Sequence, residues 1–166
     1  MAAIKNLKDL YLDGVKDLYS ACKQAVPVTE ELAAAAKNAD LKQALEASAK
    51  GTRDGMAQME KLAKAHGEDA SGEHCKGMEG LVTEARKHAL EAEFADDEVQ
   101  DAAIIAQYQR LAHYAITGYG TLKAWAKRLD LAEDAKVLDE CTASTYEGDE
   151  DMTKIAVKGG VNKAAL

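Results

Sequence analysis

The chain is poor in the residues that break helices or build strands. Its 166 residues include one proline, Pro27, and only 5% of them are aromatic. β-Branched residues are also sparse, whereas alanine, leucine, lysine and glutamate dominate the sequence. Because these four residues are strong helix formers, the composition favours an all-α protein with a core of small and medium side chains.

Other scarcities exclude whole classes of protein. The three cysteines, Cys22, Cys75 and Cys141, are an odd number without CxxC spacing, which argues against a disulfide framework and against a zinc site. No apolar run approaches the roughly 20 residues that span a bilayer. The net charge of −8 comes with no basic stripe that could neutralise phosphates. We therefore expect a soluble, cytoplasmic protein that binds neither membranes nor nucleic acid.

Apolar residues recur at spacings of three and four in four long segments, as they do on the buried faces of helices. Asp40 is the expected N-cap of the second of these helices, and Gly67 is its expected stop. The long helices are expected at about 4–37, with a bend at Pro27, at about 40–66, from 96 or 97, and from about 130.

A shorter helix is expected at about 72–90, in the long connection between the second and third long helices. A long crossover of this kind is typical of the ferritin-like topology. The prediction is an all-α, ferritin-like four-helix bundle with an additional short helix in the crossover. We expect one domain over residues 1–158, followed by an irregular C-terminal tail at 159–166.

The middle of all four apolar faces consists of small residues. Glycine inside a helix costs about 1 kcal/mol relative to alanine, so these positions need a reason. Either the helices approach each other closely there, or a cavity lies between them that holds water or a ligand. The residues of this small layer are Cys22, Ala25, Ser48, Gly51, Thr52, Gly55, Ala112, Ala115, Ser144, Thr145 and Gly148.

Five segments carry a family likeness that covers nearly the whole chain. They are LKDLYLDGVKDLYSACKQ, HCKGMEGLV, DEVQDAAIIAQYQRLAHYAITGYGTLKAWAKRL, KVLDECTASTYEGDEDMTKIA and GVNKAA. Together they resemble the YciF-like family of ferritin-like stress proteins. The resemblance implies a four-helix bundle that forms a homodimer, with a carboxylate-rich metal site in the bundle centre.

The resemblance also implies that the metal ligands have been replaced. Such a site needs glutamates and Glu-x-x-His pairs from several helices. Here Cys22 stands in place of a family glutamate, and small residues stand at most of the other ligand positions. We therefore expect no metal and no other cofactor. The remaining replacements are Ser48, Lys50, Gly51 and Gly55 for His, Glu, Glu and Gln, and Ala112, Ala115, Ser144 and Thr145 for four glutamates.

The favoured hypothesis is a pocket for a small organic molecule where the family has its metal. Cys22 would be a nucleophile in this pocket, with His113 as the only nearby base, so whether the protein is an enzyme stays open. Filling the pocket by Ala112→Leu or Gly55→Ala should raise the melting temperature. The expected ligand-binding residues are Tyr108, Ala112, Ala115, Ser48, Gly51, Gly55, Cys141, Ser144, Thr145 and Gly148.

Two alternatives remain at this point. The first is a structural or stress-response homodimer with a closed core and no ligand. The second is a metalloprotein that uses atypical ligands such as Cys22, Cys141 and His113.

Overall fold

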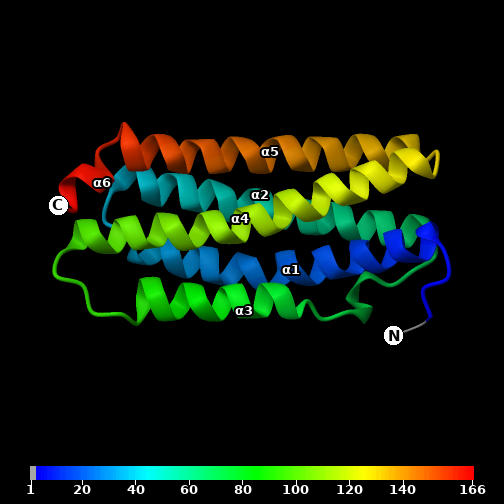
Figure 1. Ribbon diagram of the computed structural model, residues 1–166, viewed down its shortest axis with the longest axis horizontal. Helices are drawn as coiled ribbons and strands as arrows, with labels where there is room; N and C mark the ends of the chain where they lie inside the picture. Colours follow the sequence, from blue (N-terminus) through cyan, green and yellow to red (C-terminus); the bar gives the residue numbers. More distant parts are fainter. Residues whose placement is uncertain (1–2) are drawn as a thin grey trace.

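Four long helices form where the spacing of apolar residues predicts them. The computed structural model describes residues 3–166. Its long helices lie side by side in one bundle (Figure 1). They are α1 (Leu7–Ala35), which continues through Pro27, α2 (Ala39–Ala65), α4 (Asp97–Arg128) and α5 (Ala132–Val157).

The order of the helices is that of a ferritin-like bundle, as the sequence predicts. α1 and α2 form one antiparallel hairpin, and α4 and α5 form a second. The crossover between the hairpins runs the length of the bundle beside α1 and α4, so α2 and α4 point the same way (Figure 1). It contains a 3₁₀ turn (Ala70–Gly72), helix α3 (Lys76–Ala85) and a π-helical turn (Arg86–Leu90).

The helix ends are set by local signals. Asn38 is the N-cap of α2, because its side chain accepts the backbone N–H of Leu41 at 3.0 Å. The prediction that Asp40 is this cap is therefore wrong; Asp40 lies in the first turn, where its charge favours the helix dipole. Gly67, with φ of +76°, follows the last turn of α2 and ends it as predicted.

A buried carboxylate ties the α1–α2 connection to α4. Asp101 is 3% exposed, and its two oxygens accept the backbone N–H groups of Lys37 and Asn38 at 2.9 and 2.7 Å. These two N–H groups follow the end of α1, where helical partners are lacking. One side chain of the second hairpin thus accepts hydrogen bonds from the backbone N–H groups in the turn of the first.

A polar network closes the opposite end of the hairpin, at the start of α1. Tyr11 is fully buried and donates to Asp134 at 2.8 Å, and the Nε2 atom of His66 lies 2.7 Å from the same oxygen. The ammonium of Lys8 lies 2.7 Å from Nδ1 of His66. This chain of contacts joins α1, the end of α2 and the start of α5.

The C-terminal residues differ from the prediction of an irregular tail. Gly160 takes φ of +86°, and the following residues form a short helix, α6 (Val161–Ala164). The Val161 side chain is 3% exposed and belongs to the main core. The sequence did not predict this helix, because a Gly-Gly pair is typical of a loop and because the burial of Val161 depends on contacts with the rest of the fold.

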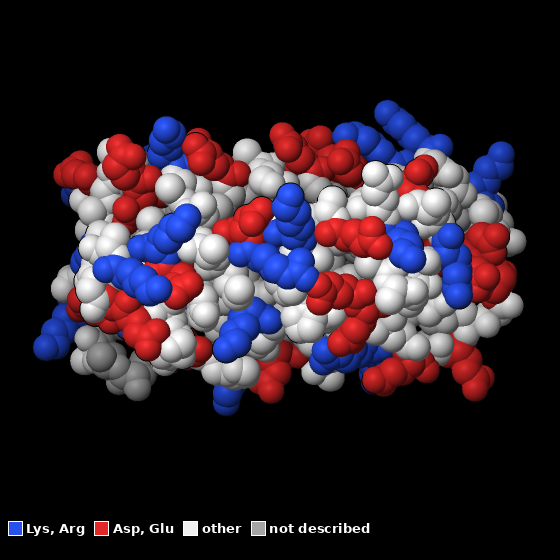
Figure 2. Space-filling view, turned by 180° about the vertical axis from the view of Figure 1, so that it is seen from behind, with Lys and Arg blue, Asp and Glu red and all other residues white. Residues whose placement is uncertain are grey.

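The surface carries both signs of charge. Figure 2 shows lysine and arginine side chains interspersed with aspartate and glutamate over one face, with no continuous basic stripe on it. In the part of the chain that the structure describes, no helix is both long enough and apolar enough to cross a membrane.

Candidate functional site

A hollow of about 430 Å³ lies in the middle of the bundle, at the level of the small residues. Its lining comes from all four long helices, with Met78 added from α3. Large side chains such as Leu45, Leu122 and Leu138 pack the core elsewhere and are each at most 2% exposed. The small side chains of the middle layer leave the space that such residues fill in an ordinary bundle.

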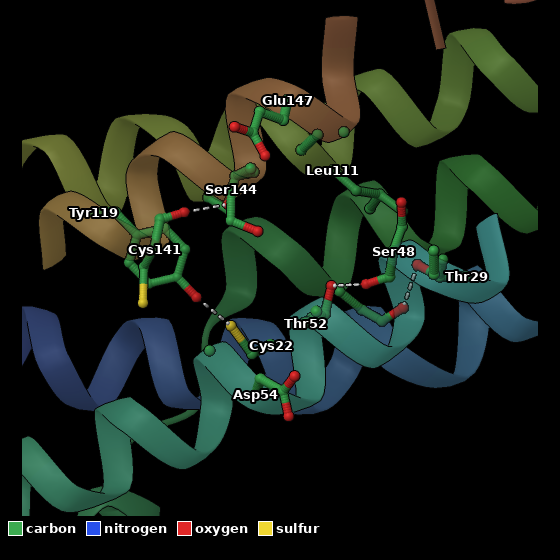
Figure 3. A pocket seen from close by; sticks show the side chains of 18 of the residues that line it. Cys22, Thr29, Ser48, Thr52, Asp54, Leu111, Tyr119, Cys141, Ser144 and Glu147 are labelled. Carbon is green, nitrogen blue, oxygen red and sulfur yellow. Dashed lines mark hydrogen bonds between the residues drawn. The ribbon is translucent and has the colours of Figure 1, made fainter. Parts of the chain in front are cut away.

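The hollow opens to solvent between α2 and α5. Every exposed residue of its lining belongs to one of these two helices. The floor is formed by buried residues of α1 and α4, including Cys22, Ala25 and Ala112. Figure 3 shows Asp54 on α2 and Glu147 on α5, on two sides of the pocket. The exposed lining residues are Ala47, Gly51, Asp54, Glu140, Ser144, Glu147 and Asp151.

Two of the lining glycines face tyrosine hydroxyls. A Cβ added at Gly55 would lie 2.5 Å from the hydroxyl oxygen of Tyr119. One added at Gly148 would lie 3.3 Å from that of Tyr108. Nothing lies within 4 Å of the corresponding point at Gly51, which faces the opening. Gly55 and Gly148 therefore give room to side chains from α4, and only Gly51 borders empty space.

The Cys22 thiol is buried and neutral. It is 4% exposed, and its sulfur lies 3.2 Å from the hydroxyl of Tyr119 (Figure 3). Burial raises the pKa of Cys22 to about 11 against the opposing effect of this hydrogen bond. Burial likewise raises the pKa of Cys141 to about 11, with the charge of Glu140 adding to the shift. Neither thiol is therefore an activated nucleophile at neutral pH.

His113 does not reach Cys22, so the predicted catalytic pair is wrong. The His113 side chain is 62% exposed, and its Nε2 atom lies 3.0 Å from a carboxylate oxygen of Asp149 on the outside of the bundle. His113 follows Ala112 by one residue, which turns it about 100° away from the face that lines the hollow. No lysine, arginine or histidine of the described chain is part of the lining.

The structure brings the expected ligand-binding residues together. Tyr108 is 7% exposed, and its hydroxyl lies beside Ser48. All ten expected residues line the hollow, together with Cys22. Their role in binding a ligand stays a prediction.

The acidic side chains at the opening are not among the site residues expected from the sequence. Glu140, Glu147 and Asp151 lie seven and four residues apart, which is the spacing of one helix face. That spacing is visible in the sequence and also includes Ser144 and Gly148. Thr29, seven residues after Cys22, lines the hollow for the same reason.

The lining does not form a metal site. Within residues 3–166, no group of three histidine, cysteine, aspartate or glutamate side chains is placed to hold a metal ion. This counts against a metal bound by Cys22, Cys141 and His113, since His113 lies outside the hollow.

The helix order, the long crossover and the central layer define a ferritin-like four-helix bundle. The chain belongs to the family described as a domain of unknown function, DUF892, which it matches over residues 6–166. It is 32% identical over 163 residues to Protein YciF of Escherichia coli (strain K12), covering 98% of this chain and 96% of that protein.

Two solved structures share the fold. YcfI from Rhodopseudomonas palustris is similar with a TM-score of 0.86 and 32% identity, covering 93% of this chain and 97% of that one. The crystal structure of the Escherichia coli stress protein YciF is similar with a TM-score of 0.86 and 31% identity, covering 93% of this chain and 96% of that one.

Proposed function

We propose that this protein is a metal-free member of its family that binds a small organic molecule in the centre of the bundle. The observation that carries the proposal is the hollow of about 430 Å³, lined by small side chains where the resemblance implies metal ligands. Its volume lies within the range of about 300–1,000 Å³ that is typical of small-molecule sites. Because the hollow opens to solvent, water fills it when no ligand is bound, and a ligand that binds only the folded chain would stabilise it.

The proposed function is ligand binding, and Cys22 is not proposed as a catalytic nucleophile. A thiol with a pKa of about 11 is ionised in only about one molecule in ten thousand at pH 7. Its hydrogen-bond partner is the hydroxyl of Tyr119, whose own pKa burial raises well above its ordinary value. Neither group can take a proton from the other at neutral pH.

The variant Ala112→Leu tests the proposal. Ala112 is 4% exposed and lines the hollow, so leucine should fill space there, raise the melting temperature and abolish ligand binding. Native mass spectrometry of freshly purified protein should find a retained molecule on the wild type and none on the variant.

The matched control is Ala126→Leu, on the same helix. Ala126 is fully buried and does not line the hollow, so leucine should overpack the core there and cost about 1–3 kcal/mol. If Ala112→Leu destabilises the protein as much as Ala126→Leu does, the middle layer is close-packed. The closed, ligand-free core is then the correct description.

The alternative is a structural or stress-response protein with no ligand. The names of the relatives favour it: one is described as a stress protein and another as a candidate structural protein. Under this alternative the hollow holds water only, and native mass spectrometry finds the bare chain.

We also propose, from the family resemblance, that the chain acts as a cytoplasmic homodimer. Sedimentation at micromolar concentration should give twice the mass of one chain. A stable monomer under these conditions would contradict the assembly and leave the pocket untouched, because every helix of the lining belongs to the same chain.

A further inference from the structure

The opening of the hollow carries charge of one sign. Four carboxylates belong to the lining, and no basic side chain does. Asp151 is held by Lys154 at 2.7 Å. No lysine, arginine or histidine of the described chain lies within ion-pair distance of Asp54, Glu140 or Glu147. These three carboxylates flank the opening from α2 and α5 and are free to pair with a ligand.

The hydroxyl groups inside the hollow add acceptors. The Thr52 side chain donates to the carbonyl of Ser48 at 2.9 Å, and Thr145 donates to the carbonyl of Cys141 at 2.8 Å (Figure 3). Thr29 donates to the carbonyl of Ala25 at 2.8 Å in the same way. A hydroxyl whose proton is used by its own helix offers only lone pairs to the space that it faces.

Apolar side chains cover much of the remaining lining, which also includes the uncharged polar residues Ser48, Gln58, Tyr108, Tyr119 and Ser144. The floor and walls include Met78, Leu111, Ala112 and Ala115, which have no polar side-chain atom able to bind a charge. A ligand that matches this lining needs hydrogen-bond donors and a positive charge at the opening, together with an apolar body over the floor. An anionic molecule would meet three unpaired carboxylates.

We propose that the hollow selects organic cations, whose ammonium group lies at the opening and is attracted by the unpaired carboxylates of Asp54, Glu140 and Glu147 around it, and whose apolar body lies over the floor. This inference rests on the proposed function and adds the class of ligand. It does not extend to metal ions, because no three ligating side chains of the described chain converge on one point.

Three molecules that share an indole ring and differ in the charge of the side group test whether the hollow prefers a positive charge. Tryptamine carries an ammonium group at pH 7, tryptophol carries a neutral hydroxyl in its place, and indole-3-acetate carries a carboxylate. Isothermal titration calorimetry with the wild type should show that tryptamine binds about tenfold more tightly than tryptophol, as one charge-assisted contact would give. Indole-3-acetate should bind more weakly than either. High salt should weaken tryptamine binding and leave tryptophol binding unchanged.

Two double variants separate a local effect from net charge. Asp54→Asn with Glu147→Gln should remove the tenfold preference for tryptamine and leave tryptophol binding as it is. Glu46→Gln with Glu150→Gln removes the same charge from exposed positions outside the lining and should keep the preference.

The outcomes also separate this inference from the proposed function. If tryptophol binds as tightly as tryptamine and Ala112→Leu abolishes both, the pocket stands and its selectivity for cations is overturned. If Ala112→Leu leaves tryptamine binding unchanged, the cation binds elsewhere and the inference is overturned. If none of the three molecules binds and the wild type retains no molecule in native mass spectrometry, the proposed function fails together with the inference.

Discussion

At the scale of single residues, the glycines of α2 separate two kinds of space. Gly51 has nothing within 4 Å of its missing Cβ, whereas at Gly55 that atom would lie 2.5 Å from the Tyr119 hydroxyl. Gly51→Ala should therefore stabilise the protein by about 1 kcal/mol, the difference in helix propensity. Gly55→Ala should destabilise it despite the same gain in propensity, because a buried hydroxyl must move. Thermal unfolding should show a higher melting temperature than the wild type for Gly51→Ala and a lower one for Gly55→Ala.

This reverses the sequence-based expectation that Gly55→Ala fills empty space and raises the melting temperature. The control is the second substitution Tyr119→Phe, which removes the hydroxyl that the new methyl group would meet. Gly55→Ala should cost less in the Tyr119→Phe background than in the wild type. Equal costs in both backgrounds would mean that the hydroxyl is not the obstacle.

The buried thiol of Cys22 makes stability depend on alkaline pH. Its pKa rises from an ordinary value of 9.0 to about 11 in the folded chain, mainly through burial. The unfolded chain therefore loses this proton first, and the free energy of unfolding falls as the pH rises from about 9 to about 11. The loss for two pKa units is up to about 3 kcal/mol.

Urea unfolding across this pH interval measures the effect. The variant Cys22→Ala should lose less stability over the interval than the wild type. Below pH 8 the thiol is protonated in both the folded and the unfolded chain, so the difference in the free energy of unfolding between the two proteins should not change with pH there. If the two proteins lose the same amount, the thiol is ionised with equal ease in the folded and unfolded chains.

At the scale of elements, one side chain of α4 supports the connection between α1 and α2. Asp101 accepts two backbone N–H groups and is 3% exposed. Asparagine has one acceptor oxygen and turns its amide N–H₂ toward the second donor, so Asp101→Asn should cost about 1–3 kcal/mol. Denaturant unfolding should show the loss, with the exposed Asp97→Asn in the first turn of α4 as the milder control at up to about 1 kcal/mol. Equal effects would mean that only the charge near the helix start matters.

The long helices could be predicted because their buried faces repeat every three or four residues. Residues such as Leu41, Leu45 and Met59 are fully buried where this spacing places them. The end positions were less predictable: several polar residues near 40 could cap α2, and geometry alone selects Asn38. The short helix α6 could not be predicted, because it depends on Gly160 taking positive φ and on Val161 finding the core.

The candidate site was predictable to the extent that it follows helix spacing. The small residues meet in one layer because four faces of equal period pack together. His113 was named because it was the one candidate base, although helix spacing already places it off the face of Tyr108, Ala112 and Ala115: one residue along a helix turns the side chain about 100°. The tyrosine hydroxyls over Gly55 and Gly148 could not be predicted, because they depend on how deeply α4 packs against α2 and α5.

At the scale of the whole molecule, the most tightly packed parts of the core lie on either side of the hollow, toward the two ends of the bundle. Fully buried side chains such as Tyr11, Leu32 and Met152 are packed toward the bundle ends, where polar contacts also join the helices. The middle layer is packed less fully, because its small side chains leave the hollow between the helices. We therefore expect substitutions at the exposed part of the lining to cost less stability than substitutions in the end layers.

The same arrangement predicts metal content. A di-metal site in a ferritin-like bundle draws ligands from all four long helices, including a Glu-x-x-His pair from each of two. Here α1 and α4 present Cys22, Ala25, Ala112 and Ala115 to the hollow, and none of these supplies a carboxylate or imidazole. Elemental analysis of protein dialysed without chelators should therefore give far less than one iron, manganese or zinc per chain. Added Mn²⁺ or Fe²⁺ should leave the melting temperature unchanged, because an ion that does not bind the folded state cannot stabilise it. About two metal ions per chain, the content of a di-metal site, would contradict this prediction.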